Sequence, residues 1–209
     1  TYTVSHDLRA PLRAMNSYSQ ILIEDYAGKV LDETAQDYAR QVAEASRRMD
    51  KLVQDLLEYS RLSRAEIPIK RVDLGSLLSE VLKGMGRRIV ERKGKVAVDE
   101  PLPAVEGHSA TLDQVLTNLI SNATKFVAPG VQPQVRVRSE VHDGWVRLWI
   151  EDNGIGIPEE HQSRIFGVFE HLHKQDEYPG TGIGLAIVKK AMERMGGKVG
   201  LESQVGKGS

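Results

Sequence analysis

The sequence predicts an α+β protein with two parts, an antiparallel helical hairpin at residues 1–66 and a mixed α/β domain at residues 67–209. In the first part, apolar residues recur at alternating spacings of four and three, which is typical of helices buried along one side. In the second part, stretches with helical spacing alternate with short runs in which apolar and polar residues alternate, as in strands. Ile67-Pro68 marks the boundary, because a proline disfavours helix in the residue before it.

The helical part contains two runs with this spacing, separated by a break at Ala27-Gly28-Lys29. The first run is Leu8, Leu12, Met15, Ser19, Leu22 and Tyr26. The second run is Tyr38, Val42, Ala45, Met49, Leu52, Leu56 and Tyr59. Two helices alone have too little core to be stable, so the pattern favours a four-helix bundle formed by two chains. We therefore predict a homodimer.

The second part is expected to place its helices over one face of a sheet. The predicted strands are Arg71–Leu74, Lys95–Val98, Gln134–Ser139, Trp145–Asp152 and Lys198–Glu202. The predicted helices are Gly75–Lys93, Ser109–Phe126 and Thr181–Met195. Along 145–152 the even-numbered residues are apolar, so the even-numbered face should point to the core.

Composition narrows the range of partners and locations. The 209 residues are 40% hydrophobic and carry a net charge of -1, which provides no general attraction to nucleic acid or to an anionic membrane. The chain has no cysteine and no apolar run of the ~18 residues that a membrane span needs. We expect a soluble, cytoplasmic segment of a longer protein, because the chain begins inside a predicted helix at Thr1.

His6 is the first residue with candidate chemistry. It lies about 200° around the first helix from Leu8, so it should point away from the buried side. An exposed imidazole beside Asp7 fits a phosphoryl acceptor whose ring is oriented by a carboxylate, and it fits an ordinary pair of surface residues as well. Pro11 should bend the helix close to His6, because it removes a backbone donor and crowds the carbonyl of Asp7.

The helix at 109–126 carries Asn118, Asn122 and Lys125 on one face. Two carboxamides and an ammonium group in line suit a magnesium ion and a triphosphate. A solvated polar face is the alternative interpretation of the same spacing.

Two glycine-rich stretches follow. Asp152 continues the apolar face of its strand, where a carboxylate needs a donor such as the exocyclic amine of adenine, unless it only caps the strand end. Gly154 and Gly156 come directly after it, and Gly180 to Leu185 open a later helix, where free amides favour phosphate. The roughly 20 residues between these stretches predict a mobile lid, anchored by Phe166 and Phe169 unless these are simply core residues.

Taken together, these stretches resemble the bacterial sensor histidine kinases, and the part from Ile165 to Leu185 resembles their phytochrome-like subgroup. Ser5-His6-Asp7-Leu8-Arg9-Ala10-Pro11-Leu12 is similar to the phosphoacceptor box of that family. The other similar motifs are the asparagine box at 118–126, the two glycine boxes at 152–156 and 180–185, and the phenylalanine box at 166–169. All five stand in the family's order along nearly the whole chain.

The resemblance implies a dimeric phosphotransfer hairpin followed by an α/β sandwich that binds ATP, of the type shared by gyrase and histidine kinases. It implies that His6 is the phosphoacceptor with Asp7 as its acid-base partner, and that Asn118 holds Mg²⁺. The implied nucleotide-binding residues are Asn118, Asn122, Lys125, Phe126, Asp152, Gly154, Gly156, Thr181, Gly182, Gly184 and Leu185. The implied partners are a response regulator receiver domain and a sensor domain upstream of Thr1.

Three positions depart from the family pattern. Ala10 stands where relatives with phosphatase activity carry Thr or Asn, so we predict weak phosphatase activity. His171 replaces an Arg of the lid, and the chain stops at Gly206-Lys207-Gly208-Ser209, before the family's last strand. Two other functions fit part of the pattern: a relative that binds nucleotide without turnover, and an ATPase of the gyrase or mismatch-repair type.

Overall fold

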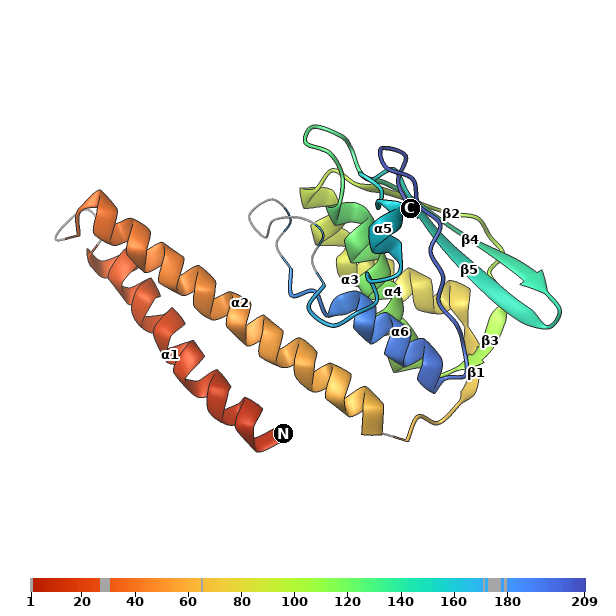
Figure 1. Cartoon of the computed structure of the whole chain (residues 1–209), viewed down its shortest axis with the longest axis horizontal. Helices are drawn as coiled ribbons and strands as arrows, with labels where there is room; N and C mark the ends of the chain where they lie inside the picture. Colours follow the sequence, from red (N-terminus) through yellow and green to blue (C-terminus); the bar gives the residue numbers. More distant parts are fainter. Residues whose placement is uncertain (1, 27–30, 65, 171, 173–177, 179) are drawn as a thin grey trace. The chain divides into compact units, whose positions relative to one another are not determined.

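The computed structural model of the chain describes residues 2–26, 31–64, 66–170, 172, 178 and 180–209, and for residues 2–11 and 64 the backbone alone. The chain forms two compact units, Thr1–Arg61 and Leu62–Ser209 (Figure 1). The division therefore comes before the predicted boundary between residues 66 and 67. No helix in the described parts of the chain has the length and apolar character of a membrane span.

The first unit is the predicted helical hairpin, made by α1 (Tyr2–Tyr26) and α2 (Glu33–Arg64) (Figure 1). Asp32 begins α2 as its N-cap, because its carboxylate accepts a hydrogen bond of 2.7 Å from the amide of Ala35. The predicted turn at 27–29 lies outside the described residues. Leu12, Val53 and Leu57 form a small apolar cluster between the two helices.

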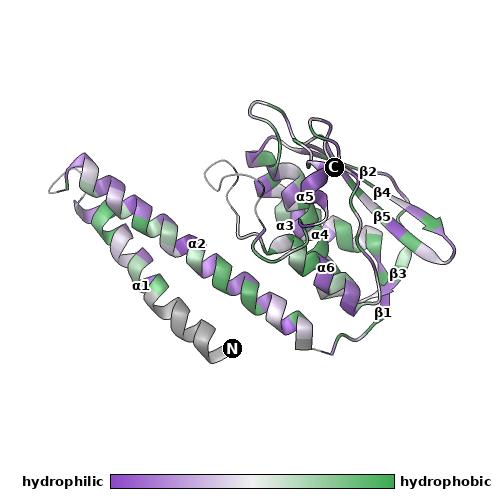
Figure 2. Ribbon diagram, viewed as in Figure 1, coloured by the Kyte–Doolittle hydropathy of each residue, from purple (hydrophilic) through white to green (hydrophobic). Residues whose placement is uncertain are grey.

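Most of the predicted heptad positions lie outside the surface through which the two helices of one chain pack. On α1, Leu12 and Ser19 are buried, but Met15, Leu22 and Tyr26 are 42 to 46% exposed. Five of the seven predicted positions of α2 are also exposed, namely Tyr38, Val42, Ala45, Met49 and Leu56, while Leu52 and Tyr59 are partly buried. The buried residues of α2 lie next to these positions, and four of the six are small or polar, namely Ala39, Ala43, Ser46 and Asp55, while Val53 and Leu57 are apolar. Figure 2 shows hydrophobic and hydrophilic residues alternating along α2.

The second unit is the predicted α/β domain. Its strands are β1 (Lys70–Asp73), β2 (Lys95–Val98), β3 (Ala104–Gly107), β4 (Gln134–His142) and β5 (Trp145–Asp152). Its helices are α3 (Leu74–Glu91), α4 (Ser109–Lys125), α5 (Glu159–Gln162) and α6 (Gly184–Arg194). β1 and β3 form an antiparallel pair, and a second sheet has the order β2-β4-β5, with β2 parallel and β5 antiparallel to β4.

The core of this unit lies between the three-stranded sheet and helices α3 and α4. Val135 and Val137 of β4 are buried there with Leu78 of α3 and Ile120 of α4, all at most 3% exposed. On β5, the even-numbered residues Val146, Leu148 and Ile150 pack against the same core, as predicted. Alternation along the strands therefore directs one face of the sheet toward the helices.

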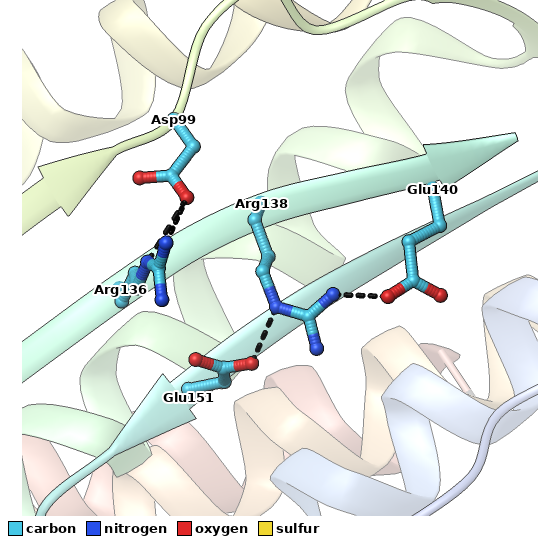
Figure 3. A network of polar contacts seen from close by, with 5 residues as sticks. All are labelled: Asp99, Arg136, Arg138, Glu140 and Glu151. Carbon is cyan, nitrogen blue, oxygen red and sulfur yellow. Dashed lines mark hydrogen bonds and ion pairs between the residues drawn. The ribbon is translucent and has the colours of Figure 1, made fainter.

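The other face of this sheet carries a network of charged residues (Figure 3). Arg136 donates to Asp99 at 2.6 and 2.9 Å, and Arg138 donates to Glu151 at 2.6 Å and also to Glu140. The guanidinium groups of Arg138 and Arg147 lie over the ring of Trp149, 4.8 and 5.4 Å from its centre. The three arginines of this network are matched by three carboxylates, and exposed pairs of this kind stabilise the fold only weakly.

Most predicted elements are present, but their ends differ for physical reasons. Helix α6 begins at Gly184 and not at Thr181, because Gly182 has a φ of 68°, which a right-handed helix does not contain. The predicted strand at 198–202 is wrong, since these described residues pair with no neighbouring strand and only Gln204 and Gly208 form a bridge. β3 and α5 were not predicted from the sequence.

Candidate functional site

Helix α4 provides one side of the site. It begins after His108, whose ring accepts a hydrogen bond from the amide of Thr111, and it ends at Phe126, which leaves the helical conformation. Val115 and Ala123 are buried, as predicted for its core side. Asn118, Asn122 and Lys125 follow on the neighbouring face and are partly exposed.

Asn118 faces the beginning of α6. Its side-chain nitrogen donates to the carbonyl of Gln114 at 2.9 Å, which fixes the amide group. Its oxygen then lies so close to Gly184 that a Cβ atom at position 184 would stand 2.8 Å from it. The start of α6 can therefore approach α4 only because residue 184 is glycine. An amide oxygen fixed in this way is a suitable magnesium ligand.

The end of α4 is held against the loop that follows β5. The amide of Ile155 donates to the carbonyl of Phe126 at 2.9 Å. A Cβ atom on Gly154 would collide with that carbonyl oxygen and with the carboxylate of Asp152. Gly154 thus permits a backbone contact that brings Asp152 and the asparagine face of α4 into one site.

Asp152 is half-buried, and among the described residues only one of its two carboxylate oxygens has hydrogen-bond partners. Its Oδ1 accepts hydrogen bonds from the amides of Gly154 at 2.8 Å and Ser209 at 3.2 Å. Oδ2 receives no hydrogen bond from the residues described here, so it is available to a donor outside the chain. Burial raises the pKa of this carboxyl group, while the two amide hydrogen bonds act in the opposite direction.

Lys125 lies in an enclosed position for an ammonium group. Its Nζ atom is 3.9 Å from the centre of the Phe126 ring, and Gly180 approaches it so closely that a Cβ atom there would lie 3.0 Å away. Burial lowers the pKa of Lys125 to about 8, and the positive charge of Arg92 adds to this effect. The ring of Tyr178 packs on Phe126 at 5.3 Å, and its hydroxyl donates to the carbonyl of Val127.

The glycine-rich stretches shape the rest of the site. Gly156 has a φ of 69° and packs against the backbone of Gln204, and Gly182 accepts a hydrogen bond from the amide of Phe169 at 2.9 Å. Thr181, Gly184 and Leu185 are partly buried around the start of α6. Phe166 is partly buried and Phe169 is 52% exposed.

The structure thus brings together the predicted residues of α4, of the loop after β5 and of the start of α6. His6 and Asp7 lie on α1 in the other unit, and their side chains are outside the described part of the structure, as is His171. Among the described residues, three or more His, Cys, Asp or Glu side chains nowhere gather into a metal site. A cation at Asn118 would therefore need further oxygen ligands from a bound phosphate group.

Sequence reasoning missed three contributors to the site. Arg92 reaches α4 from the end of α3, and Ser209 pairs with Asp152 through both its amide and its carbonyl group. Tyr178 was not assigned a role. No motif marks these residues, because each acts through contacts that the fold creates between distant segments.

The fold and the site define a protein in which an ATP-binding type of α/β domain follows a phosphoacceptor type of helical hairpin. Residues 1–65 match the model of the His Kinase A (phospho-acceptor) domain. Residues 107–209 match the model of the histidine kinase-, DNA gyrase B- and HSP90-like ATPases.

Known proteins agree with both matches. Cyanobacterial phytochrome A from Nostoc sp. is 37% identical over all of this chain, which covers 27% of that protein. Sensor histidine kinase AruS from Pseudomonas aeruginosa is 36% identical over 99% of this chain, which covers 21% of that protein. The crystal structure of full-length ShkA in complex with AMPPNP matches 99% of this chain and 43% of that one, with a TM-score of 0.72 and 31% identity.

The chain therefore belongs to the histidine kinases. It spans about a quarter of the length of the curated relatives that it matches.

We expect the substitution Asp152→Asn to weaken ADP binding by about tenfold or more. The amides of Gly154 and Ser209 would hold the side-chain oxygen, so the new NH₂ group would take the place of Oδ2. It would then face the amine of an adenine bound there as predicted, donor against donor. Titration calorimetry measures the affinity, and Asp99→Asn, an exposed carboxylate on the outer sheet face, is the control.

The same substitution should not lower the free energy of unfolding at pH 7. The pKa of Asp152 is raised in the folded protein, so its charged form costs stability above that pKa, and this cost is absent below the unfolded pKa. Asparagine removes the cost. Urea unfolding that shows a large loss of stability together with the loss of binding would contradict an adenine-reading role.

Proposed function

We propose that this chain is the kinase core of a sensor histidine kinase, which transfers the γ-phosphoryl group of ATP to His6 and then to an aspartate of a response regulator. The observation that carries the proposal is the gathering of Asn118, Lys125 and Asp152 around glycine-rich backbone in an ATPase-type domain. The helical hairpin with His6 matches a phosphoacceptor domain, which supports the acceptor role.

Within this proposal each residue of the site has a defined task. Oδ2 of Asp152 accepts a hydrogen bond from the adenine amine, and Gly154 and Gly156 let the ring approach the backbone. Lys125 and Asn122 contact the phosphate chain, while Phe126 packs against the nucleoside. The oxygen of Asn118 holds Mg²⁺, which supplies positive charge to the phosphate oxygens. Thr181, Gly182, Gly184 and Leu185 close the phosphate side at the start of α6.

The chemical step needs little more than positioning and charge neutralisation. Asp7 orients the ring of His6 and takes its proton, so that a ring nitrogen attacks the γ-phosphorus atom. The bond between this phosphorus and the bridging oxygen of ADP breaks, and ADP leaves. A carboxylate oxygen of a receiver aspartate later attacks the same phosphorus atom, and the bond between this phosphorus and the ring nitrogen of His6 breaks.

A homodimer would complete the hairpin. Apolar side chains of both helices remain 40 to 63% exposed, including Leu22 and Tyr26 of α1 and Tyr38, Met49 and Leu56 of α2. They follow the heptad spacing, so they form a continuous stripe that a second hairpin can cover. We propose that two copies form a four-helix bundle through this stripe.

The substitution His6→Gln should abolish phosphoryl transfer to the protein. We expect the unmodified chain, incubated with γ-labelled ATP and Mg²⁺, to acquire a label that is labile in acid and stable in base. The variant should bind ADP as before, because His6 does not belong to the nucleotide site. ATP hydrolysis without a protein label would instead favour a gyrase-type ATPase, and nucleotide binding without turnover would favour a binding module.

The substitution Met49→Glu should raise the dissociation constant of the dimer by about tenfold or more, because it places an unpaired charge in an apolar stripe that the second hairpin would cover. Sedimentation equilibrium measures this constant. Arg47→Glu is the control, since it makes a larger charge change at an exposed position on the opposite face of α2. Equal effects of the two variants would contradict this interface.

Ala10 leads to a prediction about the reverse reaction. Its side chain cannot orient a hydrolytic water, so the chain should dephosphorylate a phosphorylated receiver only slowly in the presence of ADP. Ala10→Thr should increase that rate without changing the labelling of His6. Rapid dephosphorylation by the unmodified chain would contradict the prediction.

A further inference from the structure

Arg92 connects the end of α3 to the helix that carries the site. It is the C-cap of α3, where a positive charge interacts well with the helix dipole. Its side chain continues to α4, where Nη1 donates to the carbonyl of Ser121 and to the hydroxyl of Thr124, each at 3.2 Å. These contacts fix the guanidinium group next to the last turn of α4, which ends at Lys125.

Arg92 and Lys125 both line a cavity of about 270 Å³. Its other walls are Thr124, the segment 127–131, Pro133 and Tyr178. Two of the lining side chains are cationic and none is acidic, so the cavity has a net positive charge. Such a cavity suits an anion with several oxygen atoms, since guanidinium and ammonium groups bind phosphate well.

The positive charge of Arg92 disfavours the charged form of Lys125. Burial lowers the pKa of Arg92, and so does the charge of Arg88 behind it. The pKa of Lys125 is lowered to about 8 by burial and by Arg92. The segment 127–133 has no ionisable side chain, Tyr178 presents a hydroxyl group, and no described carboxylate acts on Lys125. An anion bound between Arg92 and Lys125 would relieve this repulsion.

We propose that Arg92 is a second cation for the phosphate chain of the nucleotide and acts beside Lys125. The inference rests on the function proposed above, and it adds a residue from α3 that no motif contains. Lys125 belongs to the proposed nucleotide-binding face of α4. An anionic group that reaches both Lys125 and Arg92 would therefore be part of the phosphate chain of the bound nucleotide. The relief of repulsion would then contribute to nucleotide affinity.

The test compares Arg92→Gln and Arg92→Lys with the control Arg87→Gln. Arg87 lies on the same helix, is 90% exposed and pairs only with Glu91 among the described residues. Titration calorimetry of the purified chain measures the dissociation constants of ADP, of a non-hydrolysable ATP analogue and of adenosine. We expect Arg92→Gln to raise the dissociation constants of the two phosphate-bearing ligands by about tenfold and to change that of adenosine by no more than about twofold. Arg92→Lys should retain most of the affinity.

The pH dependence separates this role from a structural one. In the unmodified chain, ADP affinity should fall as the pH rises through about 8, because free Lys125 loses its proton there. Arg92→Gln removes a neighbouring positive charge, so the pKa of Lys125 rises and the fall in affinity moves to higher pH. If Arg92 had only a structural role, Arg92→Gln would weaken the binding of adenosine and of ADP equally. The pH at which ADP affinity falls would then stay unchanged.

Three results would overturn the inference. They are an affinity of Arg92→Gln equal to that of Arg87→Gln, an equal loss for all three ligands, and binding of inorganic phosphate that depends on Arg92 without competing with ADP. In each case the unmodified chain still binds ADP and labels His6, so the proposed function stands. If the unmodified chain itself binds no ADP, the proposed function fails first.

Discussion

The site depends on one backbone contact, in which Gly154 lies directly against the carbonyl of Phe126. Because Gly154 has no Cβ atom, the loop after β5 can come close enough for the amide of Ile155 to donate a hydrogen bond to that carbonyl. This contact ends α4 and at the same time places the carboxylate of Asp152 beside the helix face that carries Asn118 and Lys125. A side chain at position 154 would separate the part proposed to bind adenine from the part proposed to bind phosphate.

The ionisable groups of the site are held in positions that disfavour their charge. Burial raises the pKa of Asp152 and lowers the pKa of Lys125, and both shifts mean that the charged form costs folding free energy. The core next to them offsets this cost, since Ile120 of α4 and Ile183 before α6 are fully buried. A ligand with an amine at one end and phosphates at the other would satisfy both charges, which explains why the cost is retained.

The sequence alone predicts those parts of the fold that repeat along it. The pattern of apolar residues predicts β2 and β5 with their observed ends, and helical spacing predicts α4. These predictions succeed because burial of one face leaves a regular repeat of apolar residues in the sequence. Glycine motifs indicate the site, but Arg92 and the pairing of Ser209 with Asp152 arise only when distant segments meet. The strand predicted at 198–202 fails for the same reason, since a strand requires a neighbour that local pattern does not specify.

In the hairpin, the packing of α1 on α2 and the proposed packing of two chains use different sides of the helices. Within a chain, α1 and α2 meet through one small apolar cluster and otherwise mostly through small or polar residues. One side-chain oxygen of Asn16 and one of Asp50 are buried without a partner in the described part of the structure. Such an interior stabilises a helix pair poorly. The larger apolar residues are on the outer stripe, so most of the stabilisation would come from the second copy. Folding of the phosphoacceptor helix and dimerisation are then coupled, and His6 would be presented on a rigid helix only in the dimer.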